Sequence, residues 1–387
     1  MVPVSALADR EWSLLRAACA ANNRPDHLQK VRGLLSEALQ WDVLFDLAER
    51  HGVLPLLYQR LSTVADVVPS SEMAALQRAY HTNLHKSLFL SRELIRIVDS
   101  LESSGIRVLP YKGLALAESV YGDIAMRQAG DIDLLIRPQD LPRIREAVRD
   151  LGYVTHSHFS QAQERAFLKS GYELAFDGPG GPNLLEVQWA IQPRFYAVDF
   201  DQQGLFDRAV EVSVAGKEMS TPTLEDLFIV LSLHAAKHVW GRLIWLCDLA
   251  RLMNVRELNY EWIGSQCVDL GIARILRVTV LLTRELLGVS TAPEFERSLP
   301  RDPAAKALAK QIQLHMARGA PYNPESLAYF RLMLSLRERV ADRIRFVSRL
   351  ALTPGPGEWS RIRLPEPLFP LYRVVRLSRL AARLVKA

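Results

Sequence analysis

The sequence predicts an α+β protein in which helical N- and C-terminal regions flank a core that contains a β-sheet. Three observations support this class. Residues 1–104 carry apolar side chains at helical spacing, residues 105–215 alternate short apolar runs with turns, and residues 216–387 return to helical spacing. Apolar side chains three and four positions apart form one face of a helix, whereas short apolar runs between turn residues are typical of strands.

The composition is that of an ordinary globular protein. The 387 residues are 49% hydrophobic and carry a formal net charge of +5. Three cysteines without close spacing indicate no disulfide framework and fit a reducing compartment. No apolar stretch approaches the ~20 residues that span a bilayer, and the N-terminus lacks a signal pattern. We therefore expect a cytoplasmic protein without stable membrane insertion.

The N-terminal region is expected to be helical throughout. In “LHKSLFLSRELIRIVDSLESSG”, apolar side chains recur three and four residues apart. Two helices are expected to end at Gly52 and Gly105, because glycine readily takes the left-handed conformation that closes a helix.

The middle region reads as a small α/β domain. The segments “IRVLPYKG” and “DIDLLI” are predicted strands, “LALAESVYG” is a short helix, and “PQDLPRIREAVRDLG” is a helix with proline near its start. The apolar runs “YELAFDG” and “NLLEVQWAI” flank “GPGGP” and predict a hairpin, since glycine supplies the backbone angles that such turns need.

The C-terminal region is again helical. Thr223 is the expected N-cap of a helix in “TPTLEDLFIVLSLHAAKHVW”, and a second helix follows. The chain ends in a basic amphipathic tail, whose arginines are expected in solvent while the Leu and Val face packs on the body; binding to a membrane surface or nucleic acid is the alternative. Its basic residues are Arg373, Arg376, Arg379, Arg383 and Lys386.

Two aspartates stand out within the apolar run “GDIDLLIRP” at residues 130–138. In an extended chain Asp131 and Asp133 lie on one face, because successive side chains point to opposite faces. Two adjacent carboxylates repel each other unless a cation lies between them, and oxygen ligands of this kind suit Mg²⁺ or Mn²⁺. The pattern indicates a metal-binding strand.

Neighbouring residues sharpen this prediction. Lys112 and Gly113 stand at an expected helix start, where backbone N–H groups and a lysine can bind phosphate. Glu186 lies on a predicted strand and adds a third carboxylate if that strand neighbours “DIDLLI”. Arg127 lies four residues before Asp131 and either contacts phosphate or pairs with the aspartates and holds the loop.

His234 and His238 are one helical turn apart, with Lys237 between them. No motif glutamate or nearby cysteine accompanies the pair, so a zinc site is not predicted. We count the three as candidate nucleotide-binding residues on a packed or substrate-facing helix. Asp248 is expected to be structural and to bond one of the two histidines.

The segments “YKGLALAESVYGDIAMRQAGDIDLLIRPQDLPRIREAVRDLGY”, “LLEVQWAI” and “LSLHAAKHVWGRLIWLCDLARLM” resemble, in this order, the uncharacterised nucleotidyltransferase family of the polymerase-β-like superfamily. The resemblance implies a mixed β-sheet with helices, in which Asp131 and Asp133 hold Mg²⁺ and Glu186 completes the site. The chain departs from the usual pattern at two points. Lys112-Gly113 replaces a Gly-Gly or Gly-Ser step, and Gln188 stands where histidine is frequent.

The implied reaction is metal-dependent transfer of a nucleoside monophosphate from an NTP to an unidentified hydroxyl acceptor, with release of pyrophosphate. The acceptor can be a small molecule, a protein or RNA; nucleic acid is not favoured, because no basic cluster with interleaved aromatic residues lies beside the motif. Two alternatives remain open. One is a glycosyltransferase that uses Asp-x-Asp to bind a sugar nucleotide, and the other is a non-catalytic nucleotide-binding or interaction module.

Overall fold

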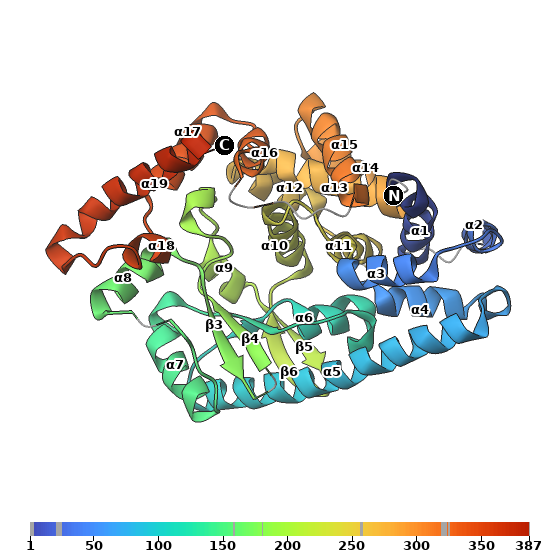
Figure 1. Cartoon of the computed structure of the whole chain (residues 1–387). Helices are drawn as coiled ribbons and strands as arrows, with labels where there is room; N and C mark the ends of the chain where they lie inside the picture. Colours follow the sequence, from blue (N-terminus) through green and yellow to red (C-terminus); the bar gives the residue numbers. More distant parts are fainter. Residues whose placement is uncertain are drawn as a thin grey trace.

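A computed structural model shows a mixed α+β protein in which helices predominate around a small sheet (Figure 1). It describes residues 4–20, 25–157, 159–179, 181–255, 258–318, 323 and 326–386. Among these residues, no helix combines the length and the apolar character that crossing a membrane requires. The predicted α+β class is confirmed.

The described residues before the sheet form five α-helices and the short 3₁₀ helix η1 (Ala65–Val67), so this region is helical as predicted. The α-helices are α1 (Val4–Cys19), α2 (Pro25–Leu35), α3 (Trp41–His51), α4 (Leu54–Ser62) and α5 (Ser70–Ser103). Gly52 closes α3 with φ 71°, and Gly105, two residues after the end of α5, has φ 67°. Both glycines therefore supply the left-handed turn for which they were predicted.

The sheet has four strands in the order β1-β2-β4-β3. These are β1 (Leu109–Pro110), β2 (Ile132–Leu135), β3 (Glu173–Gly178) and β4 (Gly181–Gln188). Strands β2 and β4 are parallel, whereas β1 pairs antiparallel with β2, and β3 pairs antiparallel with β4 in the predicted hairpin. The two central neighbours thus come from segments about 50 residues apart, a separation that leaves room for the crossover that parallel strands require.

Short helices connect the strands, and a second, two-stranded sheet follows them. The connecting elements are α6 (Gly113–Leu116), the π-helical turn η2 (Ala117–Tyr121), η3 (Ile124–Met126), η4 (Pro138–Asp140), α7 (Leu141–Asp150), α8 (Gln161–Ser170), η5 (Arg194–Tyr196) and α9 (Gln202–Asp207). The hairpin of β5 (Val210–Val214) and β6 (Lys217–Thr221) was not predicted from the sequence.

The C-terminal region is helical, and Thr223 caps its first helix by accepting a hydrogen bond from the backbone N–H of Asp226, as predicted. The elements are α10 (Leu224–Lys237), α11 (Leu243–Val255), α12 (Tyr260–Asp269), α13 (Ala273–Leu287), α14 (Pro293–Ser298), α15 (Pro303–Arg318), α16 (Leu327–Ser335), α17 (Val340–Leu352), α18 (Pro356–Trp359), η6 (Glu366–Leu371) and α19 (Tyr372–Lys386). The side chains of Arg383 and Lys386 lie outside the described part of the chain.

Two hydrophobic cores hold these elements together. One contains buried side chains of the N-terminal helices and of the C-terminal helices, such as Leu57 and Leu246. The other joins α5 to one face of the sheet, through residues such as Ile97, Leu134 and Val187. In Figure 1, α5 lies along one side of the strands, and α10 and α11 lie on the other. The division of the chain into three domains stays a prediction.

The expected packing of the C-terminal tail is wrong for Arg376 and Arg379, whereas Arg373 is exposed as expected. Arg376 is only 8% exposed and Arg379 forms an ion pair with a buried glutamate of α18, whereas Val374 and Leu377 are 62% and 45% exposed. Arg376 and Arg379 pack inward because α18 and the end of α17 provide a carboxylate and a backbone carbonyl as acceptors.

Candidate active site

The register of β2 and β4 brings the predicted carboxylates together. In this parallel pair the Cα partner of Asp133 is Glu186. Residues opposite each other in a sheet point to the same face, so both carboxylates lie on the side that α5 does not cover. Asp131 directly precedes β2, and Asp133 is 6% exposed. The expectation that the strand of Glu186 neighbours “DIDLLI” is confirmed.

A fourth carboxylate, Glu173, joins this face and was missed in the sequence. It lies at the start of β3, opposite Gln188. The side-chain amide of Gln188 lies within 3.3 Å of Asp133 Oδ1 and of Glu173 Oε2, and 3.1 Å from Glu186 Oε2. The hydroxyl of Tyr111 donates to the other end of this amide, which turns the NH₂ group toward the carboxylates. The hairpin register, had it been fixed from the sequence, would have revealed Glu173.

Lys112 is the cation bound to this cluster. Its Nζ lies 2.8 Å from Asp133 Oδ1, and both side chains are more than nine-tenths buried. Burial by itself lowers the pKa of a lysine, but the Asp133 carboxylate outweighs this effect and holds the pKa of Lys112 above its ordinary value. In this conformation the ammonium group of Lys112 neutralises Asp133. A phosphate contact of Lys112 stays a prediction.

Gly113 allows the backbone of the Lys-Gly step to lie close to Asp131. Its φ is +52°, and a Cβ at this position would lie 3.2 Å from the backbone oxygen of Asp131. An L-residue is strained at this φ, and the neighbouring oxygen belongs to the backbone and cannot easily turn away. Glycine therefore allows the loop after β1 to approach the start of β2.

We expect Gly113→Ala to lower the free energy of unfolding by on the order of 2–3 kcal/mol, because strain at positive φ adds to a tight backbone contact. Gly105→Ala is the matched control, since Gly105 has φ +67° but no atom within 4 Å of an added Cβ. Its expected cost is about 1 kcal/mol. Denaturant titration of both variants measures the difference, and equal losses would show that the contact with Asp131 has no energetic effect.

Burial and neighbouring carboxylates raise the pKa values of Asp131 and Glu186. Burial and the adjacent Asp133 raise the pKa of Asp131 to about 6. Burial, Asp133 and Glu173 raise the pKa of Glu186 from 4.5 to about 7. Each shift means that the ionised form of the carboxyl group is disfavoured in the folded protein. The positive charges nearby therefore do not fully compensate the negative charge of the cluster.

The free energy of unfolding without divalent metal should therefore fall as pH rises from about 4.5 to about 7. A raised pKa means that the folded state binds more protons than the unfolded state in this window, so deprotonation removes stability. Thermal unfolding across this range, in a chelating buffer, tests the effect. Glu186→Gln should flatten the pH dependence, and an unchanged slope in this variant would show that the effect arises outside the carboxylate cluster.

The donor set fits a hard divalent cation. Carboxylate oxygens are the ligands that Mg²⁺ and Mn²⁺ prefer, and a cation would relieve the repulsion that raises these pKa values. In the conformation described, no three His, Cys, Asp or Glu side chains of the described residues converge on one metal position. Binding therefore requires the carboxylates to turn and Lys112 to move away from Asp133 or share it.

Arg127 forms an ion pair with Asp248. This corrects two expectations, namely that Arg127 pairs with the aspartates and that Asp248 bonds one of the two histidines. Its guanidinium Nε lies 3.1 Å from Asp248 Oδ1, and neither Asp131 nor Asp133 is its partner. Asp248 bonds Arg127 and the hydroxyl of Tyr121, 2.8 Å away, in place of a histidine. The two charges pair because the loop before β2 packs against α11, where both are buried. A phosphate contact of Arg127 stays a prediction.

Helix α10 covers the carboxylate face with cationic and imidazole groups. The ammonium of Lys237 lies 3.0 Å from the hydroxyl of Tyr172, the residue before Glu173. Burial lowers the pKa of Lys237, and Glu173 and Glu186 oppose this shift. Burial and the charge of Lys112 hold the pKa of His234 well below its usual value.

The second histidine of the motif lies at the edge of this group. His238 is exposed, and its ring centroid lies 4.9 Å from that of His234. The ring centroids of both histidines lie 5.3 Å from that of Trp245 in α11. The sequence candidates thus gather between the sheet, the loop at Gly113 and α10, and their roles toward a nucleotide stay predictions.

A cavity of about 320 Å³ opens beside the cluster. Tyr172 and Glu173 form part of one wall, and residues 353–358 with Arg379 form part of the other. Residues of the C-terminal region therefore lie beside Glu173 of the carboxylate cluster.

Comparison with known proteins adds two findings. A family model described as “Uncharacterised nucleotidyltransferase” matches residues 37–288, more than half of the chain and all the candidate site residues. No curated protein matches the chain. A crystal structure of an antigenic nucleotidyltransferase-like protein from Paracoccidioides brasiliensis is similar at 14% identity and a TM-score of 0.32, covering 49% of this chain and 92% of that one.

Proposed function

The chain belongs to the uncharacterised nucleotidyltransferase family, and we propose that it transfers a nucleoside monophosphate from an NTP to a hydroxyl acceptor. The observation that carries this proposal is the register of β2 and β4, which sets Asp133 opposite Glu186 and next to Asp131. Asp131, Asp133 and Glu186 would hold Mg²⁺ or Mn²⁺. The ion, when bound, neutralises charge that develops on the phosphates.

In the proposed reaction the acceptor oxygen attacks the α-phosphorus, and the bond from this phosphorus to the bridging oxygen breaks as pyrophosphate leaves in line. Glu186 is suited to accept the proton of the acceptor hydroxyl, because its carboxylate lies opposite Asp133 on the same face of the sheet, beside the proposed metal position. Lys112 and Lys237 supply positive charge for the phosphates. Gln188 and Tyr111 restrain the carboxylates through their hydrogen bonds.

A non-catalytic nucleotide-binding module is the second candidate, and one observation favours it. The ammonium of Lys112 already neutralises Asp133, at 2.8 Å, where a catalytic cation would bind. Such a module would bind an NTP without releasing pyrophosphate.

One experiment distinguishes these functions. The purified protein is incubated with each NTP and with several sugar nucleotides, in Mg²⁺ or Mn²⁺, and pyrophosphate release and label transfer are followed for the wild type and Asp131→Asn. We expect NTP turnover that Asp131→Asn abolishes while its circular dichroism is unchanged. Turnover of sugar nucleotides alone would identify a glycosyltransferase, and undiminished activity of Asp131→Asn would overturn the metal site.

A further inference from the structure

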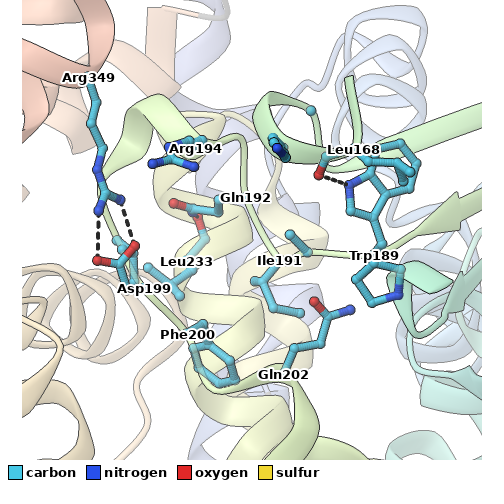
Figure 2. Close-up of a pocket in the computed structure, with 15 residues that line it drawn as sticks. Leu168, Trp189, Ile191, Gln192, Arg194, Asp199, Phe200, Gln202, Leu233 and Arg349 are labelled. Carbon is cyan, nitrogen blue, oxygen red and sulfur yellow. Dashed lines mark hydrogen bonds and ion pairs between the residues drawn. The ribbon is translucent and has the colours of Figure 1, made fainter. Parts of the chain in front are cut away.

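A second cavity, of about 380 Å³, lies beyond the end of β4 (Figure 2). Residues 189–192, which follow this strand, form one wall, and Gly171 forms part of another. The next two residues after Gly171 are Tyr172 and Glu173, which belong to the carboxylate cluster. The cavity is therefore a direct neighbour of the candidate active site.

Gln192 gives this cavity a buried hydrogen-bond acceptor. The residue is 9% exposed, and its Nε2 donates to the backbone oxygen of Leu233 at 2.9 Å. This bond fixes the orientation of the amide, and within the described residues Oε1 accepts no hydrogen bond. Figure 2 shows Gln192 between Arg194 and Leu233 among the residues that line the cavity. An unpaired buried acceptor is costly, so a donor from a bound molecule would stabilise it.

The cavity also carries positive charge. Arg349 is neutralised by Asp199, with two hydrogen bonds of 2.6 and 2.9 Å. Arg194 and Lys169 line the same space and form no direct ion pair among the described residues, although the charge of Arg194 also acts on Asp199. These two cations are thus available to an anionic group of a ligand.

Apolar side chains form the rest of the lining. Trp189 is held by its indole N–H, which donates to the backbone oxygen of Leu168 at 3.1 Å. Ile191, Phe200 and Leu233 complete the apolar surface. Together, the lining suits a small organic anion with an apolar body and a hydrogen-bond donor.

The lining of the cavity indicates which substrate this molecule is. Lys112 and Gly113, the candidate phosphate-binding residues, follow β1 at one edge of the sheet. The cavity lies past the ends of β4 and β2, because residues 189–192 and Pro138 line it, and neither Lys112 nor Gly113 is among its lining residues. A nucleotide bound at the Lys-Gly step would therefore leave this cavity free for a second molecule.

We propose that this cavity binds the acceptor substrate, a small organic carboxylate or phosphate whose anionic group pairs with Arg194 and Lys169 and whose donor bonds Gln192 Oε1. This assignment rests on the proposed nucleotidyl transfer. It selects a small acidic acceptor over a protein or RNA.

Calorimetric titration with 4-hydroxybenzoate and 4-hydroxyphenyl phosphate tests the site, since each probe combines an anion, a ring and a donor hydroxyl. We expect Gln192→Leu and Arg194→Ala each to weaken binding by about tenfold or more. Asp131→Asn, which disables transfer, should bind as the wild type does. The methyl ether 4-methoxybenzoate lacks the donor and should bind the wild type about tenfold more weakly than 4-hydroxybenzoate does.

Failure of both probes to bind, or equal binding by the wild type and the two cavity variants, would overturn the proposal. Arg194 is exposed, so Arg194→Ala remains informative if Gln192→Leu does not fold. If an NTP displaces the probes from the wild type but not from Arg194→Ala, the cavity binds the nucleotide, and the acceptor role is overturned. If the protein turns over no NTP but binds the probes in a way that depends on Gln192, the proposed transfer is overturned, whereas binding of a small acid in this cavity is supported.

Discussion

Asp133→Asn is expected to reduce nucleotide transfer on the order of 10³-fold, the loss that follows removal of one preorganised electrostatic group from an active site. It is also expected to lower the free energy of unfolding by about 3 kcal/mol, because the substitution leaves the ammonium of Lys112 buried without its carboxylate partner. The two side chains are 9% and 6% exposed, so water cannot replace the lost charge.

Pyrophosphate release and denaturant titration measure the two effects separately. Asp150→Asn is the matched control, because Asp150 is 74% exposed and outside the cluster. The double variant Lys112→Met/Asp133→Asn should regain stability without regaining activity, since it removes the unpaired charge but not the need for a metal ligand. Full activity of Asp133→Asn would exclude this residue from the site, and equal stability of the single and double variants would contradict the ion pair.

Arg127→Met is expected to cost about 3–5 kcal/mol of unfolding free energy, the largest stability loss that we predict. Asp248 is 0% exposed in its side chain, and among the described residues it would keep the hydroxyl of Tyr121 as its hydrogen-bond partner. The pair joins the loop before β2 to α11, so its loss should also loosen the aspartates from the C-terminal helices. Denaturant titration measures the cost.

The double variant Arg127→Met/Asp248→Leu should recover much of this loss, because two apolar side chains can replace a buried ion pair. Arg32→Met breaks a solvent-exposed pair with Asp66 and is the control, for which we expect little change. If Arg127→Met is as stable as Arg32→Met, the Arg127–Asp248 pair is not needed for folding. A double variant no more stable than Arg127→Met would show that packing, rather than charge, is lost.

Local signals in the sequence were sufficient for most of the elements. Helical spacing, Thr223 as an N-cap, and glycines after two helices are properties of neighbouring residues, and the structure confirms each. The hairpin of β3 and β4 was equally local. The β5–β6 hairpin was missed, because its short strands mix polar and apolar side chains and so lack the apolar runs used to find strands.

Contacts between distant segments could not be predicted in the same way. The partner of Arg127 lies 121 residues away along the chain. The inward face of α19 depends on acceptors contributed by α17 and α18, so its amphipathic pattern alone favoured the opposite face. The position of Glu173 depends on the hairpin register, which the sequence left open by a residue or more.

The sequence by itself determined the kinds of groups at the site: adjacent carboxylates at 131 and 133, a Lys-Gly step before them, and a glutamate on a later strand. Only the tertiary structure decided which of these meet. The parallel pairing of β2 with β4 placed Asp133 opposite Glu186, and the packing of the loop on the strand placed Lys112 against Asp133. The physical reason is that side-chain alternation is a local property of the chain, whereas the pairing of charges depends on which strands and helices are neighbours after folding.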